Sequence, residues 1–209
     1  GPLASESRAM SVDTCEPLRG TLALVPTPGL VEDLRRIKEP AEIERLDRSC
    51  AVNERVMRAA PDEILPGRSE GEVAWRLEQL FRDFGASELA FSPIVAVDSN
   101  AALPHAEPGR DLVKEECMGL VDMGGRHGEY NSDQTRTFWV GKRPPDYFRK
   151  ALELTQMAQA KAISVIRPGL PISEAYHAAR SYFAQFGVEK AFTHALGHGI
   201  GLETHEYPS

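Results

Sequence analysis

The stretch ILPGRSEGEVAWRLEQLFRDFG, residues 64–85, recurs further along the chain as IRPGLPISEAYHAARSYFAQFG, residues 166–187. The two copies lie 102 residues apart and share an isoleucine, a Pro-Gly pair, a glutamate, two phenylalanines and a closing glycine. In each copy, apolar residues follow the Pro-Gly pair at helical spacing. Self-similarity at a fixed offset indicates a duplicated structural unit, so the chain is expected to contain two related halves.

Four helices are expected, two in each half, because apolar residues recur at intervals of three and four. Ser69 and Glu72 form a capping box that starts a helix over about residues 70–84. A further helix precedes each copy of the repeat, with Pro40 and Pro145 near the two starts, where a missing N–H does no harm. The expected apolar faces are Ile43, Leu46, Cys50 and Met57; Val73, Leu77, Leu80, Phe81 and Phe84; Tyr147, Ala151, Leu154, Ala158 and Val165; and Ile172, Ala175, Tyr176, Ala179, Phe183 and Phe186.

Strand-like runs follow the first helix pair and predict an α+β fold, with helices packed on an antiparallel sheet. Gly, Pro and Asn separate the runs, which are Ile94–Val97, Met118–Met123 and Thr135–Val140. By the offset of the repeat, the hairpin over residues 120–137 should have a counterpart near 222–239. The sequence ends at Ser209, so the second half is expected to be incomplete.

The bulk composition excludes several classes of function. A net charge of -7, with Lys and Arg scattered among acids, disfavours nucleic acid as a partner. No apolar run reaches the roughly 18 residues that a membrane span needs, and residues 1–20 lack the pattern of a secretory signal. The three cysteines, Cys15, Cys50 and Cys117, fit neither a disulfide framework nor a paired-thiolate zinc site, which favours the cytoplasm.

Two aspartates are candidate metal ligands because both lie in or beside predicted strands. Asp122 follows an apolar run, and Asp133 comes eleven residues later in the same hairpin. Buried carboxylates that face each other repel, and a divalent cation reverses that repulsion. The alternative is that Asp122 starts a Gly-rich turn and Asp133 pairs with Arg136, since turn and ion-pair aspartates are common.

Histidines form the second candidate group. His194, His198 and His205 lie in a segment whose interspersed glycines make a helix implausible, so the segment is expected to be extended or looped. In an extended strand His194 and His198 would share a face. For each histidine taken singly, a structural imidazole is the alternative. His105 lies in a predicted loop after a strand, where a solvated side chain is the usual outcome.

Three motifs in this order resemble the creatinase, prolidase and aminopeptidase P family of metallopeptidases. They are residues 100–105 (NAALPH), the pair Asp122 and Asp133 followed by Thr-Arg-Thr, and the segment from His194 to His205. The match extends over about residues 31–209. The resemblance implies the pita-bread fold, in which two related halves of helices and curved antiparallel sheet enclose one site.

The resemblance also implies a role for each of the candidate residues. Asp122 would hold one metal ion, Asp133 would bridge two, and His198 would bind the second. The histidines His105, His194 and His205 would bind substrate and move protons. The cofactors would be two divalent ions (Mn, Co or Zn), the substrate a peptide with a Xaa-Pro bond, and a homodimer is an assembly that the family allows.

The sequence also departs from the family pattern. The family supplies two further glutamate ligands from later strands, and Glu203 and Glu206 are not in the right place to be these. Weak metal binding and no turnover are therefore expected of this polypeptide alone. Gly1 to Leu3 look like a tag remnant, with Met10 as a native start. We therefore expect residues 1–30 to be a tag and residual N-terminal segment, and residues 31–209 to be the catalytic domain.

Two other functions remain open at this stage. One is a non-catalytic pita-bread module that binds peptides or proteins, although such a module has no need of repelling carboxylates. The other keeps the fold and acts on a small non-peptide substrate, as a metal-dependent lyase or hydrolase.

Overall fold

The computed structural model describes residues 1–208, which divide into two compact units, residues 1–39 and residues 40–208. In the first unit, β1 (Leu3–Ser5) pairs in parallel with β2 (Leu24–Pro26). Two short helices, α1 (Val12–Arg19) and α2 (Leu30–Arg36), complete it, and neither has a buried residue. The expected tag remnant therefore takes part in β1, and the first compact unit runs past residue 30.

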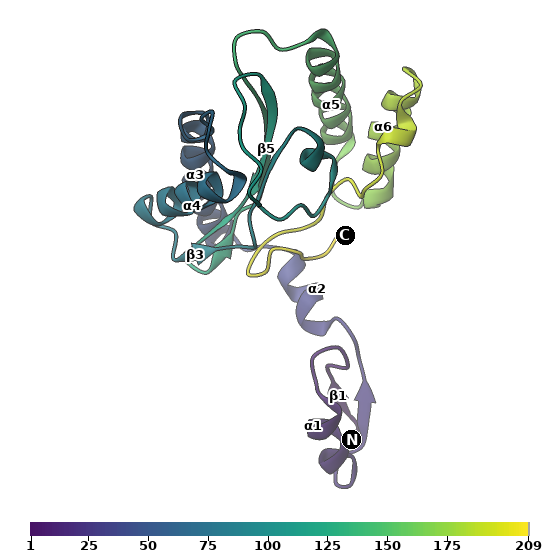
Figure 1. The fold of residues 1–209 in the computed structure, drawn as a ribbon. Helices are drawn as coiled ribbons and strands as arrows, with labels where there is room; N and C mark the ends of the chain where they lie inside the picture. Colours follow the sequence, from purple (N-terminus) through teal and green to yellow (C-terminus); the bar gives the residue numbers. More distant parts are fainter. Residues whose placement is uncertain (209) are drawn as a thin grey trace. The chain divides into compact units, whose positions relative to one another are not determined.

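The first helix pair of the second unit forms where the sequence predicts it (Figure 1). Helix α3 spans Pro40–Glu63 and α4 spans Glu70–Asp83. The capping box is present in full: the Ser69 hydroxyl accepts a hydrogen bond from the Glu72 backbone N–H, and the Glu72 carboxylate accepts one from the Ser69 N–H. Both bonds satisfy donors that the first helical turn leaves without partners.

The buried face of α3 differs from the predicted one. Ile43 is 49% exposed and Cys50 is also exposed, so their assignment to the apolar face was wrong. Two polar residues face inward instead: the Ser49 hydroxyl donates to the Gly125 carbonyl, and the Asn53 amide donates to the Met123 carbonyl, each over 3.0 Å. These bonds satisfy backbone acceptors at the end of a strand, a requirement that hydrophobic spacing cannot reveal.

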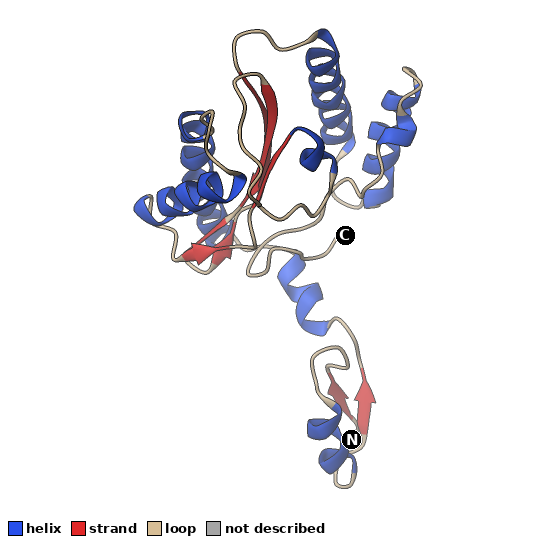
Figure 2. Cartoon of the chain, viewed as in Figure 1, coloured by secondary structure: helices blue, strands red, loops and turns tan. Residues whose placement is uncertain are grey.

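Two antiparallel sheets lie beside this helix pair (Figure 2). The larger has the order β4-β5-β8, and all three of its strands match the prediction within one residue. The smaller has the order β3-β6-β7. Their bounds are β4 Ile94–Val97, β5 Cys117–Met123, β8 Gln134–Val140, β3 Glu88–Leu89, β6 Gly125–His127 and β7 Tyr130–Asn131.

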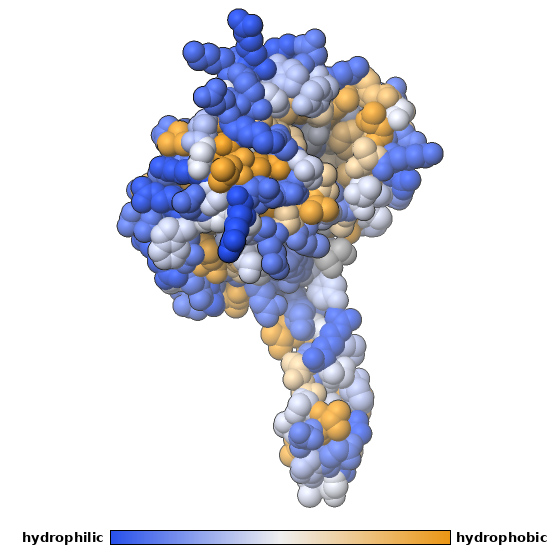
Figure 3. Space-filling view, in the orientation of Figure 1, coloured by the Kyte–Doolittle hydropathy of each residue, from blue (hydrophilic) through white to orange (hydrophobic). Residues whose placement is uncertain are grey.

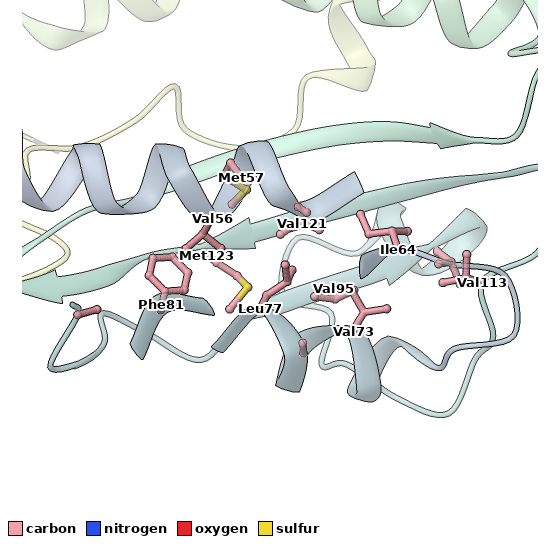
Figure 4. Close-up of a cluster of buried hydrophobic side chains, with 14 of the residues drawn as sticks. Val56, Met57, Ile64, Val73, Leu77, Phe81, Val95, Val113, Val121 and Met123 are labelled. Carbon is pink, nitrogen blue, oxygen red and sulfur yellow. The ribbon is translucent and has the colours of Figure 1, made fainter. Parts of the chain in front are cut away.

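One hydrophobic core holds α3 and α4 against the larger sheet (Figure 4). Side chains of Val56 and Met57 from α3 meet Leu77 and Phe81 from α4 and Val121 from β5. Burial alternates along β5, so its odd-numbered residues face the helices and its even-numbered residues face the other way. The helices α3 and α4 thus cover one face of the sheet, and they leave uncovered the face that carries Asp122.

The second half contains the two expected helices and a smaller core. Helix α5 spans Asp146–Val165 and α6 spans Ile172–Ala184. The buried centre of this smaller core consists of three alanines, Ala158, Ala162 and Ala179. Apolar surface is visible in the region of these helices (Figure 3). Predicted face residues Tyr147 and Phe186 are 72% and 48% exposed, and Ala151 is also exposed, so these three assignments were wrong. None of the helices within residues 1–208 has the length and apolar character of a membrane span.

Candidate metal-binding site

Asp122 lies on the uncovered face of the larger sheet, near the end of β5. Ile94 of β4 and Thr135 of β8 stand directly opposite it on the two neighbouring strands. One carboxylate oxygen, Oδ1, is buried without a hydrogen-bond partner in the described structure. A buried carboxylate oxygen that accepts nothing costs free energy, and a bound cation would remove that cost.

Asp133 lies between β7 and β8, and its side chain is 24% exposed. Burial raises the pKa of Asp133 above its usual value, and the neighbouring Asp122 raises this pKa further. His198 and His205 act in the opposite direction and lower it. Two carboxylates thus sit close enough to perturb each other, as expected for a pair that shares a cation.

His198 faces Asp133 with the nitrogen that could bind a metal. Its Nδ1 lies 2.9 Å from the Gly199 carbonyl oxygen, and its Nε2 lies 3.4 Å from Asp133 Oδ2. When Nδ1–H donates to that carbonyl, Nε2 keeps its lone pair, which is the form of imidazole that binds metals. The ring of His205 lies 4.2 Å from the His198 ring, between centroids.

Asn131 holds the histidine segment against the aspartate hairpin. Its backbone N–H donates to the Gly201 carbonyl over 2.9 Å, and its buried side-chain amide donates to the Leu202 carbonyl over 2.9 Å. The Thr204 hydroxyl adds a bond to the Ala90 carbonyl over 2.9 Å. These contacts span the two halves, and the sequence analysis missed them because a lone asparagine beside a strand carries no distinctive spacing.

The segment from His194 to His205 forms a loop, as its glycines predicted. A Cβ at Gly199 would collide with the Tyr207 carbonyl, and one at Gly201 would collide with the Glu206 carboxylate. The groups that approach these glycines therefore belong to the chain itself. The loop doubles back, with Glu206 N–H donating to the Gly199 carbonyl over 2.9 Å.

The other two candidate histidines, His194 and His105, are both exposed. His194 is exposed, with Nδ1 2.7 Å from the Ala195 carbonyl oxygen and its ring edge-on to Phe192. Because its segment is a loop, the strand geometry that would place it on one face with His198 is not formed. His105 is exposed in the loop after the 3-10 helix η1 (Asp98–Ala102).

The chemistry of these side chains fits a divalent cation, although they do not converge into a complete coordination site. Hard carboxylate oxygens with one imidazole suit Mn²⁺, Co²⁺ or Zn²⁺. Within residues 1–208, no three or more His, Cys, Asp or Glu side chains come close enough together to hold a metal ion. The orphaned oxygen of Asp122 and, in the tautomer whose Nδ1–H donates to Gly199, the lone pair of His198 Nε2 nevertheless leave donors available beside Asp133.

Comparison with known proteins places this fold and residue order in one family. The model of metallopeptidase family M24 matches residues 44–209, so the chain belongs to that family. The chain is 36% identical over 179 residues to the Xaa-Pro dipeptidase of Pyrococcus furiosus, covering 86% of this chain and 51% of that protein. It is 32% identical over 177 residues to an uncharacterized peptidase of Staphylococcus aureus.

Solved structures agree with the pita-bread fold. Prolidase from Pyrococcus furiosus superimposes with a TM-score of 0.91 at 33% identity, over 99% of this chain and 61% of that one. The Xaa-Pro dipeptidase from Bacillus anthracis gives 0.94 at 33% identity, over 100% and 59% of the two chains. The chain spans about half the length of the curated relatives it matches.

Proposed function

We propose that this chain forms most of the catalytic domain of a metal-dependent peptidase that hydrolyses Xaa-Pro bonds. The observation that carries the proposal is the approach of His198 Nε2 to Asp133, beside the unpartnered oxygen of Asp122. Membership of family M24 and the names of the relatives, Xaa-Pro dipeptidase and prolidase, support the substrate class.

Each site residue has a role that its chemistry can perform. Asp122 would hold one divalent ion, Asp133 would bridge two, and His198 would bind the second through Nε2. Such ions, when bound, lower the pKa of water and polarise a carbonyl. The exposed His105, His194 and His205 would bind the substrate and move protons, since an imidazole can donate to a developing oxyanion or a leaving nitrogen.

Two further glutamate ligands belong to the proposal and would lie beyond residue 209. With Asp122, Asp133 and His198 alone, each ion lacks part of its protein coordination. We therefore infer that the 209-residue chain binds Mn²⁺ weakly and does not turn over peptide, whereas a protein extended through those glutamates does both.

The test is cleavage of a Xaa-Pro dipeptide with added Mn²⁺, Co²⁺ or Zn²⁺, measured for the chain as given and for the extended protein. In the extended protein, Asp133→Ala should lower kcat/KM by roughly a thousandfold or more, because a lost bridging ligand removes charge stabilisation of the transition state. Asp146→Ala, at an exposed position at the start of α5, is the matched control and should change little.

Each outcome decides one part of the proposal. Turnover by the chain as given would show that no further ligands are needed. Metal binding by the extended protein without cleavage of any Xaa-Pro peptide would favour a binding module or a different substrate.

Localisation and assembly also belong to the proposal. The thiols of Cys15, Cys50 and Cys117 are all free, which supports a reducing compartment such as the cytoplasm. A homodimer would be consistent with the family resemblance, and light scattering of the extended protein would test it.

A further inference from the structure

A carboxylate outside the candidate metal site is buried and fully engaged by a single loop. Glu70, the first residue of α4, is 1% exposed. Its Oε1 accepts hydrogen bonds from Val97 N–H over 2.8 Å and from the Asn100 side-chain amide over 2.9 Å. Its Oε2 accepts one from Gly109 N–H over 3.0 Å. Glu70 therefore binds both ends of the loop formed by residues 97–109.

The helix itself does not require this carboxylate. Ser69 and Glu72 already cap the N-terminus of α4, and Glu72 is the acid that completes the capping box. The second copy of the repeat has Ile172 at the position that corresponds to Glu70, and α6 forms there. A glutamate is among the residues least often buried, so the loop is the feature that accounts for it.

Additional bonds fix the same loop around Glu70. Asp98 has a left-handed backbone, with φ of 47°, and its carboxylate accepts bonds from Met118 N–H over 3.2 Å and from Lys114 Nζ over 2.7 Å. Asn100 bridges Glu70 and Asp111, donating to the latter over 2.8 Å. A strained backbone held by several partners is a common property of functional loops.

The helix backbone also contacts the loop directly. Glu70 N–H donates to the Asp111 carbonyl and Gly71 N–H to the Gly109 carbonyl, each over 3.0 Å. A Cβ at Gly71 would lie 3.3 Å from the Gly109 carbonyl oxygen, so this approach favours a residue without a side chain. The loop is thus fixed to the first turn of α4 by backbone and side chain together.

We propose that Glu70 is a positioning residue for His105, which lies between the two points where Glu70 holds the loop. The inference rests on the proposed function, in which His105 contacts the substrate. Its physical basis is separate: without the carboxylate, Val97 N–H and Gly109 N–H lose a common acceptor, and His105 loses a fixed position relative to α4.

Hydrogen–deuterium exchange of the chain as given tests the structural step. Glu70→Gln keeps the size but places an amide NH₂ opposite one of the two N–H donors. Amides of residues 98–109 should then exchange roughly tenfold faster or more, the change expected for loss of one hydrogen bond to a charged group. Glu72→Gln, on the same helical turn, is the control and should leave the loop at the wild-type rate.

A second variant keeps the test decisive if Glu70→Gln unfolds the protein. Asn100→Ala removes a partner of Glu70 from the loop side and leaves α4 intact. Faster exchange confined to residues 98–109 in either variant supports the proposal. Loop exchange at the wild-type rate in a folded variant would overturn it, and so would an equal rise throughout α3 and α4.

Kinetics of the extended protein separates this inference from the proposed function. Glu70→Gln should raise KM or lower kcat in the same sense as His105→Ala, and the double variant should be no worse than His105→Ala alone. If His105→Ala costs activity and Glu70→Gln does not, the positioning role is wrong. If Glu70→Gln opens the loop but His105→Ala costs nothing, the role assigned to His105 in the proposed function is wrong.

Discussion

The two halves share a sequence repeat but differ in how deeply they bury it. Ile64 is 3% exposed, whereas its counterpart Ile166 is 63% exposed. Phe81 is 1% exposed in a core that includes strands, whereas its counterpart Phe183 is partly buried against a centre of three alanines. Local sequence is therefore enough to form both helix pairs, but burial of the apolar face depends on whether a sheet lies against it.

The largest expected effect on stability comes from truncating Phe81, and its size should differ from that of truncating its counterpart Phe183. Phe81→Ala should lower the free energy of unfolding by about 3–5 kcal/mol, because it leaves a cavity in a close-packed core. The site is tight, since a Cβ at Gly125 would lie 2.5 Å from the Phe81 ring. Phe183→Ala should cost less than about 2 kcal/mol, because Phe183 is only partly buried and packs against small alanine side chains. Urea unfolding would measure both, and equal losses would contradict the difference between the halves.

The next effect concerns the link between the halves. Asn131→Ala removes a buried donor and leaves the Leu202 carbonyl without its partner, which should cost about 1–3 kcal/mol. Exchange of amides in residues 199–206 should rise in parallel. Thr204→Val, which removes only the bond to Ala90, should cost about 1 kcal/mol or less. If Asn131→Ala leaves both stability and exchange unchanged, Asn131 does not hold the histidine segment.

A smaller effect should separate the two equivalent helix starts. Ser69 caps α4 through its hydroxyl, whereas the N-cap residue of α6 is Pro171, which makes no side-chain cap bond. Ser69→Ala should therefore cost about 1 kcal/mol, and Pro171→Ala should change stability by less than about 0.5 kcal/mol. Thermal unfolding of the two variants would show the difference. Equal shifts would mean that capping does not distinguish the halves.

Sequence reasoning succeeded where a signal is local and periodic. The capping box and apolar spacing located α4, and strand-like runs separated by Gly, Pro and Asn located β4 and β5. It failed where polar side chains turn inward to serve the backbone, as at Ser49 and Asn53. Periodicity treats such residues as solvent-facing, because the carbonyls that they satisfy come from distant parts of the chain.

In the candidate site, too, some residues could be predicted from the sequence and others could not. Residue type and order were enough to select Asp122, Asp133 and His198, which the structure places close together, although their role as ligands stays a prediction. Glu70 and Asn131 could not be selected, because a first-turn glutamate normally complements the helix dipole and a lone asparagine normally marks a turn. Their importance becomes visible only from their partners in space.

The smallest expected effect is the pH dependence contributed by Asp133. Burial and Asp122 raise its pKa in the folded state above the 3.8 of the free side chain. The folded protein therefore takes up this proton before the unfolded chain does as the pH falls. The metal-free protein should gain stability as the pH drops from neutral through the folded-state pKa toward 3.8, and it should lose that gain as the pH rises again.

Asp133→Asn isolates this contribution, because the amide cannot ionise. The variant should be more stable than the wild type at pH 7 without metal, and the difference should shrink as the pH falls toward 4. Added Mn²⁺ at pH 7 should stabilise the wild type and not the variant, since a cation that binds the folded state shifts the unfolding equilibrium. Asp146→Asn, whose side chain is 93% exposed, controls for loss of a negative charge. If Asp133→Asn is the less stable protein at pH 7 without metal, the carboxylate is already satisfied by His198, and the argument for a cation between the two halves loses its electrostatic support.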